Sequence, residues 1–192
     1  MPRTATPNQR SRILASARAV FARLGAGATI DDIAKEAGVS HGLAYRYFPG
    51  KDSLLQALVD EALEAGRAGL KHFEEMSGAP EERLALLLSQ LIESRRARPE
   101  FYLVLDHVRH APATPPKLRK QIQAQKEAFL DLLRRLIVAG QKRGKVYAGD
   151  PDRLVMAVSI FLEGMGRMAQ YEPAAFGAAC PGPEMILRVV MK

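Results

Sequence analysis

Residues 29–51 have the sequence TIDDIAKEAGVSHGLAYRYFPGK, in which we expect two short helices to meet at a tight turn. Thr29 is a typical helix N-cap, and Asp32 at the third helical position predicts a weaker form of the capping box. Gly38 ends the first helix, because glycine adopts a positive φ at no steric cost. Ser40 is the expected N-cap of the second helix, which ends at the Pro-Gly pair. Two short helices joined in this way predict a helix-turn-helix motif.

The motif, about residues 29–48, has a second helix whose outer face suits the major groove of DNA. At 100° per residue, His41, Gly42, Tyr45 and Arg46 lie together on that face, which carries no carboxylate. Arg46 has the donors to bind guanine O6 and N7 together, and Gly42 removes bulk where the backbone approaches DNA. We therefore expect this helix to enter the groove with its N-terminus leading.

Hydroxyl and ammonium groups flank this helix and predict contacts with the DNA backbone. The expected phosphate donors are Tyr45, Tyr47, Thr29 and Lys51. The backbone amides after Ser40 add an anion site at the start of the helix. Residues 1–51 hold eight Lys and Arg against three acidic residues, so they carry +5 of the net charge of +7. A solvated basic surface is the alternative interpretation of that charge.

The rest of the chain also predicts helices, because no stretch alternates with the period of two that a strand requires. Helices are expected to begin at Pro80 and Pro99, and further helices comprise about residues 8–24, 51–76, 117–143, 152–171 and 183–192. A loop rich in Pro, Ala and Gly separates the last two. The predicted fold class is all-α, with about nine helices. Residues 1–50 would form a three-helix DNA-binding domain, and residues 51–192 a second, larger helical domain.

Composition excludes several classes of protein. A chain of 192 residues buries enough surface to fold without a disulfide or a metal. Cys180 is the single cysteine, which excludes an intrachain disulfide, and we interpret it as incidental rather than as a redox sensor. The longest apolar run, residues 154–162, is too short to cross a membrane, and the first residues lack the apolar core of a secretory signal. We expect a cytoplasmic protein with no membrane partner.

The stretch from Thr29 to Leu55 resembles the DNA-binding domain of the TetR (tetracycline-repressor-like) family. The shared features keep their order and spacing: a Thr that starts the helix, an Ile-Ala pair, an Ala-Gly-Val-Ser turn, then Gly, Tyr, Tyr-Phe, Lys and Leu-Leu. With the preceding helix, the resemblance covers about residues 8–60. Beyond it, only the helix count, the helix lengths and the turn at residues 140–151 match.

The resemblance implies a homodimeric transcription regulator that binds a near-palindromic operator. A small molecule in the C-terminal domain would shift the two DNA-binding heads apart. The groove-facing set implied by the resemblance is His41, Gly42, Leu43, Tyr45 and Arg46, and the phosphate set is Thr29, Tyr47 and Lys51. Ala44 stands where the family has a larger apolar residue, which predicts looser packing of this helix. Asp31 is interpreted as an acid that complements the helix dipole.

Aromatic and methionine side chains of the helical domain suit an adaptable ligand cavity. The candidates are Phe101, Tyr102, Leu105, His107, His110, Phe129, Phe161 and Met165. An ordinary core is the alternative for all of them. Asp106, His107 and His110 also have the spacing of a metal cluster, but we interpret them as polar residues that line or flank the helical domain. No metal site and no cofactor are predicted.

A surface for self-association is predicted on the helices 152–171 and 183–192. Gly164 and Gly166 each lower helix stability by about 1 kcal/mol relative to alanine, and close packing at a dimer face would explain them. The last helix is apolar and has little of its own chain left to cover it. Glu163, between apolar neighbours, is expected to pair with Arg167 at the i,i+4 spacing.

These patterns together predict a transcriptional repressor that a small molecule releases from its operator, and no enzyme. The chain has no nucleophile elbow, no phosphate-binding loop and no paired His-Glu metal motif. Two alternatives stay open. One is an architectural or cell-division DNA-binding protein without an effector, and the other is a metal-dependent helical enzyme built on Asp106, His107 and His110.

Overall fold

Ten α-helices and one short 3₁₀ helix appear in the computed structural model, which describes residues 9–110 and 114–192. Within those residues no β-strand forms, although Val146 and Met191 make an isolated antiparallel bridge. The predicted all-α fold class is therefore confirmed. The helices are α1 (Gln9–Leu24), η1 (Gly25–Gly27), α2 (Ile30–Ala37), α3 (His41–Tyr47), α4 (Lys51–Glu75), α5 (Pro80–Ala97), α6 (Pro99–His110), α7 (Pro116–Lys142), α8 (Pro151–Tyr171), α9 (Pro173–Ala179) and α10 (Pro183–Val190).

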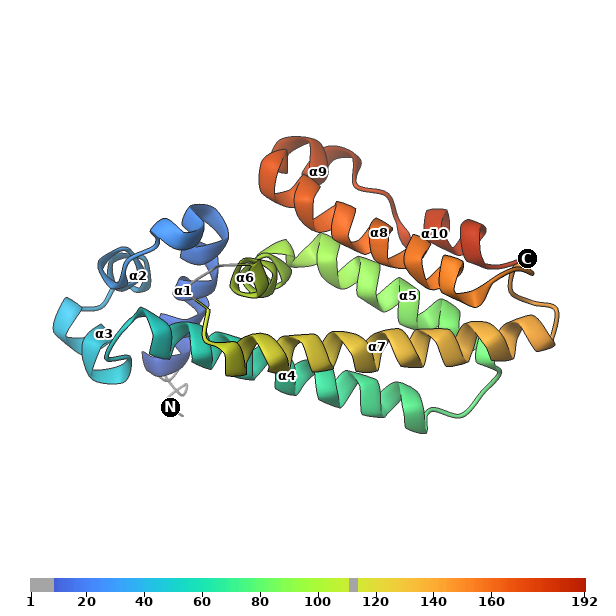
Figure 1. Ribbon diagram of the computed structural model, residues 1–192. Helices are drawn as coiled ribbons and strands as arrows, with labels where there is room; N and C mark the ends of the chain where they lie inside the picture. The colour runs from blue at the N-terminus through green and yellow to red at the C-terminus, as the bar shows by residue number, and fades with distance from the viewer. Residues whose placement is uncertain (1–8, 111–113) are drawn as a thin grey trace, which may run out of the picture.

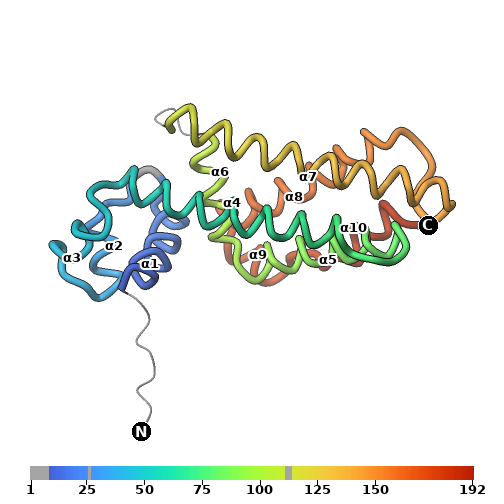
Figure 2. Tube along the Cα trace, turned by 90° about the horizontal axis from the view of Figure 1, so that it is seen from below, coloured from blue at the N-terminus to red at the C-terminus, as the bar shows by residue number. Residues whose placement is uncertain are grey.

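The two longest helices, α4 and α7, run side by side along the molecule (Figure 1, Figure 2). Helices α1, α2 and α3 gather at one end, and α10 and the C-terminus lie at the other (Figure 1). Helix α6 lies between these ends, where it contacts α1 and η1 on one side and α5, α7 and α8 on the other. The shape is therefore a small head joined to an elongated helical body.

Two main apolar cores follow this axis. The head core joins α1, α2, α6, the first half of α4 and the start of α7, and its buried members include Ile13, Phe21, Leu54, Val59 and Val108. The body core joins the end of α4 to α5, α7, α8, α9 and α10, and its buried members include Leu88, Ile92, Leu133, Ile137 and Val158. Apolar burial of this kind is the main stabilising term in folding.

Helix α4 belongs to both cores. Leu54, Leu58 and Leu63 lie in the head core, whereas Phe73 lies in the body core. The domain boundary predicted between residues 50 and 51 stays a prediction, but the head core extends well past that point along α4. One continuous helix thus connects the head to the body.

The segment after α8 was expected to be a loop, and this expectation is wrong for its first part. Residues 173–179 form α9, with Pro173 in its first turn and Phe176 buried in the body core. Proline is compatible with a first helical turn, because its missing N–H has no partner there in any helix. The apolar ring of Phe176 then holds the short helix against α8.

The expected pair between Glu163 and Arg167 is also wrong. Glu163 of α8 instead accepts a hydrogen bond from Lys126 of α7 at 2.8 Å and lies 3.6 Å from Arg109 of α6. Arg109 in turn lies 2.9 Å from Asp106 on its own helix. The carboxylate therefore links three helices rather than two turns of one.

We predict that Gly140→Ala destabilises the protein, because a Cβ at this buried position in α7 would overlap the side chain of Val146. Overpacking should outweigh the gain in helix propensity and cost about 1–2 kcal/mol of unfolding free energy in urea titration. Gly69→Ala is the matched control, since its Cβ would meet no atom within 4 Å, and it should be neutral or stabilising. A Gly140→Ala protein as stable as the parent would contradict this packing.

We predict that the contribution of Glu163 to stability depends on pH. The hydrogen bond from Lys126 and the nearby charge of Arg109 hold the pKa of Glu163 below its ordinary value of 4.5. Because the folded protein then binds this proton less readily than the unfolded chain, the contribution is complete above pH 4.5 and is lost as the pH falls through the lowered pKa. Glu163→Gln should lower the melting temperature slightly at pH 7 and by less at pH 3, where part of the contribution is lost. A difference that is equally large at both pH values would refute the assignment.

Candidate DNA-binding surface and effector cavities

The helix-turn-helix begins with a complete capping box. The Thr29 hydroxyl accepts a hydrogen bond from the Asp32 backbone N–H at 3.1 Å. The Asp32 carboxylate accepts from the Thr29 backbone N–H at 3.0 Å and from its hydroxyl at 2.6 Å. These bonds hold the pKa of Asp32 below its ordinary value. The cap is thus stronger than the sequence alone predicted, because aspartate at N3 is short but reaches back successfully.

The turn between α2 and α3 depends on Gly38. This residue has φ 62° and ψ 39°, a left-handed conformation in which a side chain would be strained. The guanidinium of Arg12 in α1 donates to the carbonyl of Ala37 at 2.8 Å and so satisfies the end of α2. Ser40 then starts α3 by accepting from the Leu43 backbone N–H at 3.3 Å. Helix α1 therefore stabilises the turn that sets the orientation of α3.

Helix α3 is held to the head by small apolar contacts. Ala44 is fully buried and packs with Ile30 and Ala34 of α2, and Phe48 is buried against α1 and α4. The looser packing expected at Ala44 stays a prediction, although this side chain is fully buried. The half-buried Leu43 and Tyr47 also lie on α3, and Tyr47 packs against the head core.

The outer face of α3 is open. His41, Gly42, Tyr45 and Arg46 are all exposed, as the helical spacing predicted. A Cβ added at Gly42 would meet no atom within 4 Å. Arg46 makes no hydrogen bond or ion pair with any residue that the structure describes. The helix lies at the tip of the molecule, at the opposite end from α10 (Figure 1). The exposed outer face of α3, with its hydrogen-bond donors, thus lies at the end of the head.

Asp31 has a role that the sequence did not reveal. Its Oδ1 lies 2.9 Å from Nε2 of His41, and the His41 ring lies against that of Tyr45 with centroids 4.4 Å apart. The contact joins the start of α2 to the start of α3, although all three side chains are exposed. Asp31 therefore orients a predicted groove residue as well as complementing the helix dipole. Only the angle between the two helices brings these residues together.

The predicted phosphate contacts fall in several environments. The Thr29 hydroxyl is already engaged in the cap. Tyr47 is half-buried beside the head core, and the Lys51 ammonium lies 5.6 Å from the ring centroid of Phe21. Leu43 is half-buried on α3. The assignment of these residues to DNA stays a prediction.

The eight predicted effector residues do not gather into one cavity. Three of them belong to the body core, namely Phe129, Phe161 and Met165. Of the others, Leu105 packs against the head core, and Tyr102 hydrogen-bonds Ser94 at 2.8 Å while the guanidinium of Arg95 lies over its ring. Phe101 lies edge-on to Tyr102. The ordinary-core alternative therefore describes four of the eight, Phe129, Phe161, Met165 and Leu105, and the effector role of the set stays a prediction.

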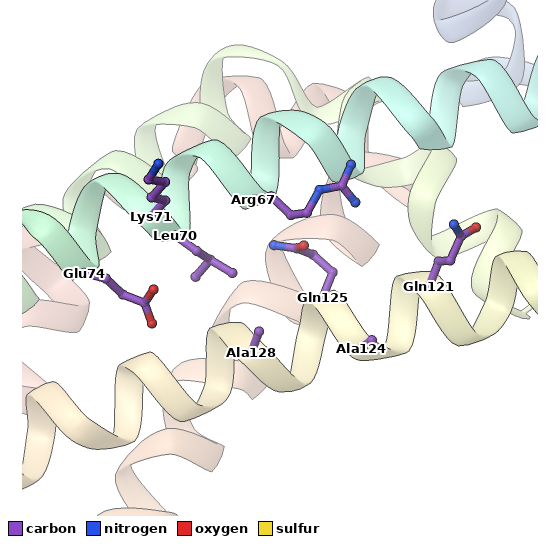
Figure 3. Close-up of a pocket in the computed structure, with 8 residues that line it drawn as sticks. All are labelled: Arg67, Leu70, Lys71, Glu74, Gln121, Ala124, Gln125 and Ala128. Atoms are coloured by element: carbon purple, nitrogen blue, oxygen red, sulfur yellow. The ribbon is translucent and has the colours of Figure 1, made fainter.

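Two cavities that the structure does contain lie elsewhere, along α4 and α7. One, of about 370 Å³, is lined by Arg67, Leu70 and Lys71 of α4 and by Gln121 and Gln125 of α7 (Figure 3). The second, of about 390 Å³, is lined by residues that include Arg83, Leu132 and Leu136. Glu74 borders both cavities. Sequence reasoning missed them because it searched for aromatic residues, whereas the described residues that line the two cavities include no aromatic side chain.

The three residues of the metal alternative do not form one cluster, since Asp106 and His110 are in contact but His107 lies elsewhere. Asp106 contacts Arg109 and His110, while the ring of His107 faces Gly25. Among the residues that the structure describes, no group of three His, Cys, Asp or Glu side chains could hold a metal ion. Cys180 is half-buried, and burial raises the pKa of its thiol, which lowers its nucleophilic thiolate fraction.

No helix within residues 9–110 and 114–192 combines the length and the apolar character needed to cross a membrane.

Comparison with known proteins identifies both halves of the chain. Residues 13–58 match the family model for bacterial regulatory proteins of the tetR family, and residues 77–167 match the model for the tetracyclin repressor-like C-terminal domain. The chain is 36% identical over 81 residues to the HTH-type transcriptional regulator BetI of Brucella suis biovar 1 (strain 1330), a match that spans 42% of this chain and 41% of BetI. It is 28% identical over 151 residues to the HTH-type transcriptional regulator RutR of Escherichia coli (strain K12), which spans 78% of this chain and 70% of RutR.

A solved structure shares the whole fold. The ketosteroid transcriptional regulator KstR2 of Mycobacterium tuberculosis superposes with a TM-score of 0.80 over 97% of each chain, at 19% sequence identity. The matched models cover the helix-turn-helix and most of the helical body described above. The prediction of a TetR-type regulator is therefore confirmed, and the chain belongs to the TetR family of bacterial regulatory proteins.

Proposed function

We propose that this TetR-family regulator is a repressor that binds a palindromic operator as a homodimer and is released by a small-molecule effector. The observation that carries the proposal is the open outer face of α3, where Tyr45 and Arg46 are exposed, on a helix that lies at the tip of the head (Figure 1). A cationic, carboxylate-free helix face held on a rigid head suits the major groove. A role on DNA agrees with a cytoplasmic location.

The dimer is supported by apolar surface on α8 and α10. Met156, Ile160, Met168 and Tyr171 are exposed along one side of α8, and Met185 and Val189 are exposed on α10. Ile160 is 63% exposed and Tyr171 is 70% exposed, which is unusual for large apolar side chains that recur along a helix face. A Cβ at Gly164 or Gly166 would meet no atom of this chain, so the glycines are available for close packing by a partner. Two copies related by a twofold axis would present two α3 helices to a palindrome.

The effector is supported by the two cavities along α4 and α7 and by the path from them to the head. Helix α4 lines both cavities and begins at Lys51, directly after the recognition helix and its turn. A ligand that favours one arrangement of α4 would shift the population of DNA-binding heads. A DNA-binding protein without an effector is the alternative, and a ligand that changes operator affinity would exclude it.

We predict that Arg46→Ala weakens operator binding by about 1–3 kcal/mol, or roughly 5- to 150-fold, and relaxes specificity at one base pair. The operator would first be selected from a random DNA pool with the intact protein, and affinity would be measured by fluorescence anisotropy at fixed salt. Lys35→Ala removes the same charge from α2 and should have a much smaller effect. Undiminished binding by Arg46→Ala would show that this side chain does not contact a base.

We predict that Ile160→Glu dissociates the dimer, because each subunit would bury an unpaired carboxylate at the interface. The dimer dissociation constant should rise by about 100-fold or more in sedimentation measurements. Operator affinity should fall with it, since a monomer contacts one half-site. Leu86→Glu places the same charge on exposed surface of α5 and serves as the control. An Ile160→Glu protein that remains dimeric would refute the proposed interface.

A further inference from the structure

The smaller of the two cavities lies where neither core holds α4 against α7. Along α4 the head core ends at Leu63, and the body core begins at Phe73. Along α7 the corresponding limits are Ile122 and Leu132. No residue between these limits is buried on either helix. The interval is thus a gap between the buried residues of the two cores, in which Leu70 and Phe129 are only half-buried against the body core, and the cavity of about 370 Å³ lies along it.

Both helices carry small residues along this interval. Gly66 and Gly69 lie on α4, and Ala124 and Ala128 lie on α7. In Figure 3, Leu70 and the amide of Gln125 project into the space between the helices, and Gln121 projects from the same helix as Gln125. The volume lies within the range of about 300–1,000 Å³ that is typical of ligand sites.

The polar groups around the cavity do not pair with one another in hydrogen bonds or ion pairs. The Gln121 side-chain oxygen is buried and accepts no hydrogen bond. Arg67 makes no hydrogen bond or ion pair with the described residues. The carboxylate at the border of the cavity, Glu74, already accepts a hydrogen bond from Arg135 at 2.6 Å. The open cavity is therefore lined by an exposed guanidinium that has no counter-ion among the described residues and by a buried acceptor without a donor.

We propose that this α4–α7 cavity binds the effector, and that the effector is a small organic carboxylate with a flat apolar body and one N–H or O–H donor. Its carboxylate would pair with Arg67, since a guanidinium binds two carboxylate oxygens at once. Its donor would satisfy the Gln121 oxygen, because a buried acceptor without a partner is costly. Leu70, Ala124 and Ala128 would contact the apolar body. The inference rests on the proposed function, of which it names the effector class and site.

Such a ligand would contact both halves of the molecule. Arg67 follows the head-core segment of α4 by one turn, and Gln121 lies beside Ile122, a head-core residue of α7. Leu70 packs against the body core. A ligand bound in the gap would therefore change the packing between the head core and the body core. Such a change is required if ligand binding in the body is to alter DNA binding by the head.

The first test compares probes on the full-length protein. Indole-3-acetate and 4-hydroxybenzoate have the carboxylate, the flat body and the donor, and both should raise the melting temperature and give heat on titration. Indole-3-acetamide lacks the negative charge, and 1-methylindole-3-acetate lacks the ring donor. Each should bind about tenfold or more weakly than indole-3-acetate. Failure of both complete probes to bind at millimolar concentration would overturn the proposal.

The second test locates the site. Arg67→Gln should weaken indole-3-acetate about tenfold or more and leave the weaker binding of indole-3-acetamide nearly unchanged. Gln121→Leu should weaken indole-3-acetate more than 1-methylindole-3-acetate. Lys120→Gln is the matched control, since it removes the same charge from α7 outside the cavity lining and should leave indole-3-acetate binding intact. Melting temperatures without probe show that each variant is folded. Equal affinity for indole-3-acetate in the parent and both cavity variants would overturn the site.

The third measurement separates this inference from the proposed function. Operator affinity is recorded with and without indole-3-acetate, on DNA selected with the probe-free protein. A fall in affinity that Arg67→Gln abolishes supports the effector assignment. Binding of the probe with no change in operator affinity overturns it. A probe-free protein that selects no DNA sequence instead overturns the proposed function, whatever the probes do.

Discussion

The rest of the structure depends on the continuity of α4 through two separate apolar cores. A helix of this length is rigid, and its two ends are buried against different partners: Leu54 and Leu58 in the head core, and Phe73 in the body core. Figure 2 shows α4 leaving the head and running beside α7 into the body. A change in the orientation of the head therefore moves α4, together with α6 and α7, which also connect the head to the body. The gap in packing around Arg67 lies on α4, between the two cores.

The recognition helix is short and keeps its outer face free because its support comes from the other side. A seven-residue helix is not stable alone. Here the Ser40 cap, the buried Ala44 and the guanidinium of Arg12 on the end of α2 hold it in place. Asp31 contacts the outer face of α3 through His41. Local capping and a few small contacts therefore leave most of the proposed DNA-binding surface exposed.

In the body, charged side chains form ion pairs that connect neighbouring helices. Glu163 joins α8 to Lys126 and Arg109, so the helix that carries the proposed dimer surface is tied to both α7 and α6. Helix α6 in turn packs against α1 and η1 of the head. Movement of α6 or α7 would disturb the ion pairs on α8. The proposed effector cavity and the proposed dimer surface therefore share α7 as a common neighbour.

Periodicity and capping chemistry were enough to predict the all-α fold, the limits of the head helices and the outward face of α3. These features follow from contacts within three or four residues, which a sequence displays directly. The partner of Glu163, the contact between Asp31 and His41, and the dispersal of the eight predicted effector residues could not be predicted in this way. Each depends on the angle and register between helices far apart in the chain. The sequence by itself thus determined all the α-helices except α9 and which of their faces are apolar, whereas the packing of α4 against α7 decided where a cavity remains.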